Sequence, residues 1–480
     1  MADPAAQRPF DLRRPGSGRP RRSRIGAAIL ATVAGIAVLG VGFGRSAGTI
    51  AGPSSAPIAA RSNIPPGGSP GPSARPGSSS PDAGPSSGPG ASSSAPPPTG
   101  PSAVLAVRLQ STLERMRVKL AIPGVSATVL LPDGTTWTGV SGLADVAART
   151  KVAPDTAFAY ASVSKTFTSA LILQLIDEGK LRLADSAAAF LPPLRLAIDR
   201  RITIGMLLNH TSGLADYFLN PKIDRPLQAR PADTWTVDRT LGYVGRRVSA
   251  PGAAWHYSNT NYLLLGLIAE RLTGQTLGEA IRTRLLEPTG LASTWFQAEE
   301  PARMSLAHGY RFVGTKRTAK PIDLDDGSSG IAPFRSVITA AGGAGSIAGT
   351  SDDLARWARA LYSGKVLGPQ ATAMLLSGFT KTRNYLPGVV YGYGVQAVTI
   401  AGHASLGHSG RLLGFRSAVR HFPIDGLTIA VLTNQSRADP GLIVQALLAV
   451  AAPPPPTPPG APPSGAPGAS AAPSQGVLGP

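Results

Sequence analysis

The chain has no cysteine among its 480 residues, so disulfide bonds and thiol nucleophiles are excluded. Its six histidines show no H-E-x-x-H or comparable spacing, which gives no indication of a metal site. We therefore expect neither a metal nor another cofactor. Any covalent catalysis must use a nucleophile other than cysteine.

Acidic residues are also scarce, with 27 Asp and Glu against 46 Lys and Arg, which gives a formal net charge of +19. Such a charge can indicate nucleic-acid binding. The basic residues are nevertheless scattered, their only dense run lies at the extreme N-terminus, and no aromatic side chains alternate with them. We expect no nucleic-acid partner.

Long hydrophobic runs are limited to one uncharged stretch, residues 25–44, which follows an arginine-rich segment over 1–24. Twenty residues are about the length that crosses a bilayer core, and preceding arginines favour a cytoplasmic N-terminus. The pattern predicts a single-pass signal anchor, with the remainder of the chain outside the cytoplasm. The alternative is a cleaved signal peptide and a secreted protein, since small residues near Ser46 and Ala60 could be cut.

Pro, Ser, Gly and Ala dominate residues 45–102 and 452–480. Such composition cannot bury enough apolar surface to fold, so we expect a disordered linker and a disordered tail. Residues 103–451 remain as one large folded domain.

Strand patterns lie near both ends of this domain, and helical patterns lie between them. The sequence predicts hairpins over 126–140 and 415–432, and helices over 105–120, 354–362 and 441–451. A capping box at Thr350-Ser351-Asp352-Asp353 precedes the second of these helices. We expect an α+β fold with a central antiparallel sheet flanked by helices and an inserted helical lobe.

Ser162 and Lys165 open a long amphipathic run that stops at Gly179. Residues three apart share one helix face, so the two side chains would lie side by side. A serine hydroxyl is a weak nucleophile until a base takes its proton, and a lysine with a tuned pKa can contribute. A helix-capping serine beside a solvated lysine is the alternative.

Two further groups of candidate site residues follow along the chain. Tyr257 and Asn259 stand between a Pro-Gly turn and a helical run that ends at Gly274, where Asn259 could also be only a helix cap. His408, Ser409, Gly410 and Arg411 come just before the second predicted hairpin.

Three short motifs, in their order along the chain, resemble those of penicillin-recognising serine hydrolases. They are Ser162-x-x-Lys165, Tyr257-x-Asn259 and His408-x-Gly410. The Tyr-x-Asn form is similar to class C β-lactamases, and His-x-Gly to D-alanyl-D-alanine carboxypeptidases and esterase-like relatives. The resemblance covers about residues 103–450. It implies the β-lactamase/transpeptidase fold.

The resemblance also implies roles. Ser162 would be acylated, and Lys165 with Tyr257 would manage its proton, Tyr257 acting as a base only if cations hold its phenolate. Asn259 would bind the substrate amide and Lys165. The backbone N–H groups of Ser162 and Arg411 would form the oxyanion hole.

The third motif bears on the substrate. Gly410 would let an extended peptide lie along the strand edge, and Arg411 or Arg416 could bind a terminal carboxylate. Where β-lactamases of this group carry lysine, this chain has His408, which would be a titratable cation. We expect the charge of His408, rather than its hydrogen bonding alone, to affect the activity. The implied substrate is a peptidoglycan stem peptide. A β-lactam or an ester, or acylation without turnover, is the alternative.

Overall fold

The computed structural model describes residues 100–452, apart from 298, 313–319, 326, 328–329 and 384. The predicted basic segment, the predicted membrane span and nearly all of the predicted linker and tail lie outside these residues. Among the described helices, none has the length and apolarity needed to span a bilayer.

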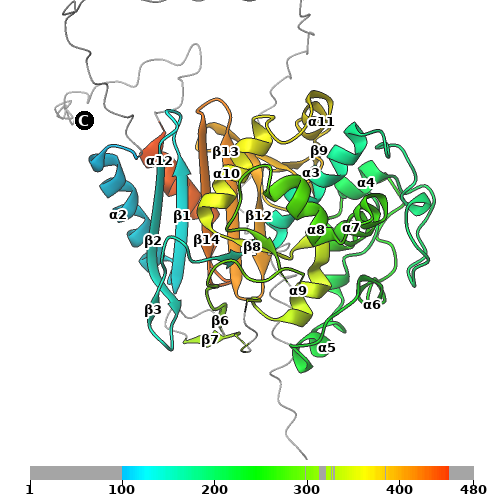
Figure 1. Ribbon diagram of the computed structural model, residues 1–480, viewed down its shortest axis with the longest axis horizontal. Coiled ribbons are helices and arrows are strands. Elements are labelled where there is room, and N and C mark those ends of the chain that lie inside the picture. Colours follow the sequence, from blue (N-terminus) through cyan, green and yellow to red (C-terminus); the bar gives the residue numbers. More distant parts are fainter. Residues whose placement is uncertain are drawn as a thin grey trace, which may run out of the picture. The chain divides into compact units, whose positions relative to one another are not determined.

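The centre of the described chain is an antiparallel sheet in the order β3-β2-β1-β14-β13-β12-β11-β10-β9 (Figure 1). Its strands are β1 (Gly124–Leu130), β2 (Thr136–Asp145), β3 (Thr150–Lys151), β9 (Thr380–Lys381), β10 (Val390–Tyr391), β11 (Gln396–Ile400), β12 (His403–Leu412), β13 (Phe415–Phe422) and β14 (Leu427–Thr433). The strand β1 near the start of the domain pairs with β14 near its end.

Both predicted hairpins are present. The turn at Pro132-Asp133-Gly134 joins β1 to β2, and Asp133 accepts hydrogen bonds from the backbone and side chain of Thr135 at 2.9 and 2.7 Å. Gly134 has φ of 86°, which glycine adopts without strain. The second hairpin joins β13 to β14 in a continuous register from Arg416 to Phe422.

One face of the sheet is covered by α2 (Ala103–Lys119) and α12 (Gly441–Ala451), the first and last helices of the described chain (Figure 1). Leu109 and Leu113 from α2 pack with Val129, Ile429 and other buried apolar side chains into one core cluster. Because alternate residues of a strand point to opposite faces, the other set of strand side chains faces a second core.

The opposite face carries α3 (Ser164–Asp177) and α10 (Ser351–Tyr362), which pack together. The rings of Phe167 and Trp357 stack at 4.0 Å between centroids, and the Trp357 indole donates to the Thr166 hydroxyl at 2.8 Å. The predicted cap of α10 is present, because the Thr350 side chain accepts from the backbone N–H of Asp353 at 3.2 Å. These contacts fix the nucleophile helix against the sheet.

The inserted lobe between α3 and α10 is largely helical, as predicted. Its helices are α4 (Ile204–Leu208), α5 (Asp224–Ala229), α6 (Val237–Leu241), α7 (Asn259–Thr273), α8 (Leu277–Ile281) and α9 (Arg335–Ala341), and α11 (Pro369–Leu375) follows α10. Small sheets pair β4 (Phe158–Ala159) and β5 (Trp295–Phe296) with β8 (Ile347–Gly349), and β6 (Tyr310–Phe312) with β7 (Pro321–Asp323). The α+β fold with a flanked antiparallel sheet is confirmed.

Candidate active site

Ser162 stands in a single 3-10 turn, Ala161–Val163, immediately before α3. Ala161 has φ of 51°, a left-handed conformation that is costly for a residue with a Cβ and that gathers at functional sites. The turn is held from the sheet, because the Ser417 hydroxyl of β13 donates to the Tyr160 carbonyl at 2.6 Å. The fold therefore fixes the nucleophile in a strained turn.

Lys165 is fully buried, and its Nζ contacts three oxygen atoms. It lies 3.2 Å from Ser162 Oγ, 2.7 Å from Asn259 Oδ1 and 2.8 Å from the Ala344 carbonyl. Both carbonyl oxygens can only accept hydrogen bonds. When Lys165 is neutral, its two N–H bonds satisfy these carbonyls, and its lone pair is directed at the Ser162 hydroxyl.

The electrostatics favour this neutral form. Burial lowers the pKa of Lys165 to about 7, although the charge of Asp216 opposes the shift. A base with a pKa near the working pH is suited to proton transfer. Lys165 can therefore accept the proton of Ser162 as the hydroxyl attacks a carbonyl.

Asp216, which the sequence analysis missed, extends this network. Its Oδ2 accepts a hydrogen bond from Asn259 Nδ2 at 2.9 Å, and its Oδ1 accepts from the backbone N–H of Phe218 at 3.0 Å. Because the Asn259 amide donates to Asp216, its Oδ1 must face Lys165. Burial raises the pKa of Asp216 to about 6, opposed by the Phe218 hydrogen bond and the charge of Lys165. Asp216 therefore orients the asparagine.

Tyr257 lies beside the same pair. Lys165 Nζ is 5.1 Å from the centre of the Tyr257 ring, and the Tyr385 ring stacks on the same ring at 5.5 Å between centroids. Burial and Tyr385 raise the pKa of Tyr257 well above 10, and a hydrogen bond with Ser162 only partly opposes this. These shifts favour the neutral phenol form of Tyr257 and leave Lys165 as the group beside Ser162 whose pKa lies near neutrality.

A buried turn that contains His210 packs against Tyr257. His210 has φ of 63°, its ring lies 4.3 Å from that of Tyr257, and its Nδ1 accepts the backbone N–H of Ser258 at 3.2 Å. Ser212 donates to Asn261 Oδ1 at 2.7 Å. These contacts join segments that are distant along the chain, so local spacing does not reveal them.

His408 does not supply the expected cation. It is fully buried, its Nδ1 donates to the Ser409 carbonyl at 2.7 Å, and its Nε2 accepts from the Tyr391 hydroxyl at 2.9 Å. Burial and the charge of Lys165 lower its pKa well below 6.5. His408 is a neutral hydrogen-bonding residue behind the strand, and it lines neither cavity beside Ser162.

Gly410 has a different role from the one expected. A Cβ at this position would lie 2.4 Å from the Tyr160 carbonyl and 2.2 Å from Ser417 Oγ, so the glycine lets β12 approach the nucleophile turn. The space it preserves is inside the protein. An unpaired strand edge is nevertheless present, because β11 pairs with β12 only as far as Gly407. Within the described part of the chain, residues 409–411 therefore have no partner strand on that side.

Two cavities meet at Ser162. The larger, of about 480 Å³, is lined by Tyr257, Asn259, Ser409, Gly410 and Arg411, together with Asp216, Trp255, Tyr385 and Arg416. The smaller, of about 60 Å³, lies between Ser162, Asn259 and Arg411 on one side and helices of the lobe on the other. Except for buried Lys165 and His408, the sequence-predicted site residues thus line one pocket.

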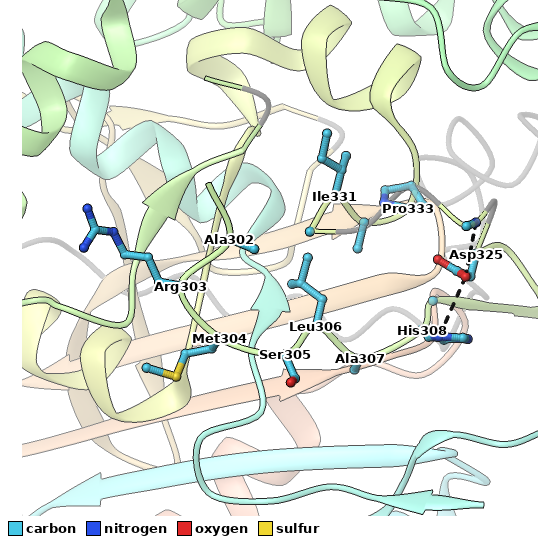
Figure 2. Close-up of a pocket in the computed structure, with 14 residues that line it drawn as sticks. Ala302, Arg303, Met304, Ser305, Leu306, Ala307, His308, Asp325, Ile331 and Pro333 are labelled. Atoms are coloured by element: carbon cyan, nitrogen blue, oxygen red, sulfur yellow. Dashed lines mark hydrogen bonds and ion pairs between the residues drawn. The ribbon is translucent and has the colours of Figure 1, made fainter. Parts of the chain in front are cut away.

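A separate cavity of about 490 Å³ contains none of them (Figure 2). Figure 2 shows His308 and Asp325 side by side at one end of this lining, joined by a dashed line. His308 Nε2 and Asp325 Oδ2 are 3.8 Å apart. Potential metal-ligating atoms of Asp145, His308 and Asp323 lie within 4.8 Å of one another nearby. This partly exposed cluster comes from segments distant along the chain, so sequence spacing could not reveal it. None of its residues lines the two cavities at Ser162.

A serine in a strained turn, a buried lysine whose lone pair faces it, and a tyrosine beside both define a hydrolase that works through an acyl-enzyme. The family model described as Beta-lactamase matches residues 109–452. The chain belongs to the beta-lactamase family of serine hydrolases, as the three motifs indicated.

Individual relatives differ in what they act on. Penicillin-binding protein 4 of Amycolatopsis lactamdurans is 31% identical over 342 residues, which cover 68% of this chain and 84% of that protein. Esterase EstB of Burkholderia gladioli is 28% identical, covering 57% of this chain and 74% of the esterase. A crystal structure of a D-stereospecific amidohydrolase from Streptomyces sp. superposes with a TM-score of 0.61 at 28% identity, covering 71% of this chain and 98% of that one.

Proposed function

We propose that the protein is a membrane-tethered hydrolase outside the cytoplasm that removes the terminal residue from D-alanyl-D-alanine peptides of the cell wall. The observation that carries this proposal is the set of arginines around the larger cavity, namely Arg383, Arg411 and Arg416. Arginine binds carboxylates in bidentate fashion, and a carboxypeptidase must recognise a free terminal carboxylate.

Arg411 of β12 and Arg416 of β13 are directly paired across these two antiparallel strands. The Nε atoms of both are buried without a hydrogen-bond partner among the described residues. Burial lowers the pKa of Arg411 to about 10, as does the charge of Arg416, so both remain cationic at neutral pH. Asp439 also lines this cavity and offsets part of the charge of Arg416, while the unpaired Nε donors of both arginines favour an anionic group beside Ser162.

The strand edge supports a peptide substrate. No described strand pairs with residues 409–411 where they line the cavity, and an extended peptide can add there through main-chain hydrogen bonds. The relative named as a penicillin-binding protein and the neighbour named as a D-stereospecific amidohydrolase agree with this choice.

Rates on three substrates test the proposal: a D-alanyl-D-alanine peptide, its C-terminal amide and a neutral acyl ester. We expect the free acid to be preferred over the amide by about 10-fold or more, since charged hydrogen bonds contribute about 1.5–3 kcal/mol. Arg411→Gln should remove most of this preference. Equal rates on acid and amide would contradict carboxylate recognition.

An esterase is the second candidate, favoured by the apolar side chains of Leu214, Leu219, Val248 and Trp255 in the same cavity. In that case the neutral ester should be cleaved well and the peptide poorly. Hydrolysis of the ester alone, lost in Ser162→Ala, would assign this function instead.

A further inference from the structure

A buried arginine lies behind the larger cavity without a counter-charge beside it. Arg420 of β13 is only 6% exposed, and no carboxylate in the part of the chain that the structure describes forms an ion pair with it. Its Nη2 donates to Gln396 Oε1 at 2.6 Å, and its Nη1 donates to the Gln396 carbonyl oxygen at 3.5 Å. Because guanidinium nitrogens can only donate, Arg420 fixes which atom of the Gln396 side-chain amide faces it.

The orientation of the Gln396 amide determines the hydrogen bonds of its other neighbours. Since Oε1 accepts from Arg420, Nε2 points the other way, and an amide nitrogen can only donate. It donates to Tyr385 Oη at 2.7 Å and to Ser409 Oγ at 3.2 Å. Both hydroxyl oxygens therefore act as acceptors toward Gln396 and keep their own protons.

The proton of the Tyr385 hydroxyl has no acceptor in the folded chain. Ser409 Oγ lies 3.4 Å from Gln396 Oε1 and can donate there, whereas Tyr385 Oη donates to no residue that the structure describes. Burial raises the pKa of Tyr385 to about 12, with the charge of Arg420 opposing the shift, so the phenol is neutral at neutral pH. Its proton is therefore available to a bound group.

The position of Tyr385 places this donor where substrate binds. Tyr385, Ser409 and Arg411 all line the larger cavity at the nucleophile. The Tyr385 ring is held by aromatic neighbours, with centroids 5.5 Å from the ring of Tyr257 and 5.1 Å from that of Trp255. A phenol, a serine hydroxyl and a guanidinium are all hydrogen-bond donors, so this side of the cavity suits oxygen acceptors.

We propose that Tyr385 is a substrate-binding residue, whose hydroxyl donates to a carboxylate or carbonyl oxygen of the substrate group in the larger cavity. Gln396 and Arg420 are positioning residues that fix this direction of donation. In the proposed carboxypeptidase reaction the acceptor is the terminal carboxylate, and the inference rests on that function only for this identity. The hydrogen bond itself requires an oxygen acceptor, which a peptide acid and its amide both offer.

Three ligands that differ at one group test the contact. They are N-acetyl-D-alanyl-D-alanine, its C-terminal amide, and N-acetyl-D-alanyl ethylamide, in which a hydrogen atom replaces the carboxyl group. Calorimetric titration of the Ser162→Ala protein measures binding without turnover. We expect the amide to bind about 3–10-fold more tightly than the ethylamide, the range for a neutral hydrogen bond, and the acid to bind more tightly again.

Tyr385→Phe removes one oxygen and keeps the ring that stacks on Tyr257. Added to Ser162→Ala, it should lower the preference for the amide over the ethylamide by about threefold or more. An unchanged preference would overturn the role of Tyr385.

Gln396→Glu tests the direction of donation. Beside Arg420 the introduced carboxylate is favoured in its ionised form and can only accept, so Tyr385 would donate to it instead of to the ligand. The amide preference should then fall as far as in Tyr385→Phe, although the tyrosine is intact. Because amide and ethylamide are both neutral, charge repulsion does not explain such a loss.

The matched control is Gln370→Glu, which makes the same substitution at an exposed position of α11 that does not line the cavity. It should leave the amide preference unchanged. If Gln396→Glu also leaves it unchanged, the positioning role of Gln396 and Arg420 is wrong.

The acid and the amide together keep this inference apart from the proposed function. If the acid is preferred over the amide and Tyr385→Phe changes neither preference, carboxylate recognition stands and the role of Tyr385 is wrong. If acid and amide bind alike, and both lose affinity relative to the ethylamide in Tyr385→Phe, the hydrogen bond stands and the carboxypeptidase function fails.

Discussion

Lys165 is the residue on which the chemistry of the site depends. Its two shortest hydrogen bonds go to carbonyl oxygens, and burial lowers its pKa to about 7. A lowered pKa means that the neutral, proton-accepting form predominates above that pH. Activity should therefore appear as the pH rises.

We predict that kcat/KM on a neutral ester rises with pH through an apparent pKa near 7, because only neutral Lys165 accepts the Ser162 proton. Lys165→Arg should lower kcat/KM by about 10²–10⁴-fold, the usual contribution of general acid–base assistance. In the control His408→Gln the rising limb should stay in place, since His408 titrates well below this range. A limb that disappears with the histidine would assign the titration to His408.

Asp216 offers a second test, which separates orientation from charge. Asp216→Asn keeps a side-chain carbonyl that can accept from Asn259 Nδ2 but removes the negative charge that raises the pKa of Lys165. We predict that the rising limb moves to lower pH while kcat on the plateau is largely retained.

Asp216→Ala removes both the hydrogen-bond acceptor for Asn259 and the negative charge. The Asn259 amide can then rotate away from Lys165. We expect about a 10²-fold lower kcat, comparable with the effect of a 1 Å misplacement. Identical pH profiles for the wild type and Asp216→Asn would show that the charge of Asp216 has no role.

At the level of elements, β12 and the nucleophile turn form one unit. Gly410→Ala would place a Cβ 2.4 Å from the Tyr160 carbonyl, so either the strand or the turn must move. We predict about a 10²-fold loss of kcat/KM and destabilisation by about 1–3 kcal/mol, measured by ester hydrolysis and urea unfolding. In the control Gly245→Ala, the new Cβ meets only Ala215 at 3.8 Å, and both quantities should stay near those of the wild type.

The elements themselves were largely predictable from local patterns. Period-two alternation and the turn at Pro132-Asp133-Gly134 indicated the first hairpin, and the Thr350 cap indicated the start of α10. The serine and tyrosine motifs were visible because each spans at most four residues. Asp216 was not, since its partner Asn259 lies 43 positions away, and no local spacing encodes that contact.

The protonation states of Tyr257 and His408 could not be predicted from the sequence for a related reason. Sequence gives reference pKa values, whereas burial decides the protonation state. Both side chains lie within aromatic and hydrogen-bonded surroundings that form only in the folded chain. The identity of these residues was therefore predictable, and their charge was not.

At the level of the whole molecule, the place where the enzyme acts depends on whether residues 25–44 form the anchor that the sequence predicts. We predict that the full-length protein sediments with membranes, that external protease degrades it in intact cells, and that deletion of 25–44 leaves it in the cytoplasmic soluble fraction. A mature N-terminus near Ser46 or Ala60 would show a cleaved signal peptide and a secreted enzyme.

The pairing of β1 with β14 sets the time at which this enzyme becomes active. Val125 faces Thr433 across the two strands, so the sheet cannot close until about 300 further residues have been made. At about 5–20 residues per second, a ribosome needs about 15–60 s for that stretch. During this interval β12, which supports the Ser162 turn, is also largely missing. The newly made chain therefore passes through synthesis as an unfinished sheet without hydrolytic activity, and such non-local pairing makes its folding intrinsically slow.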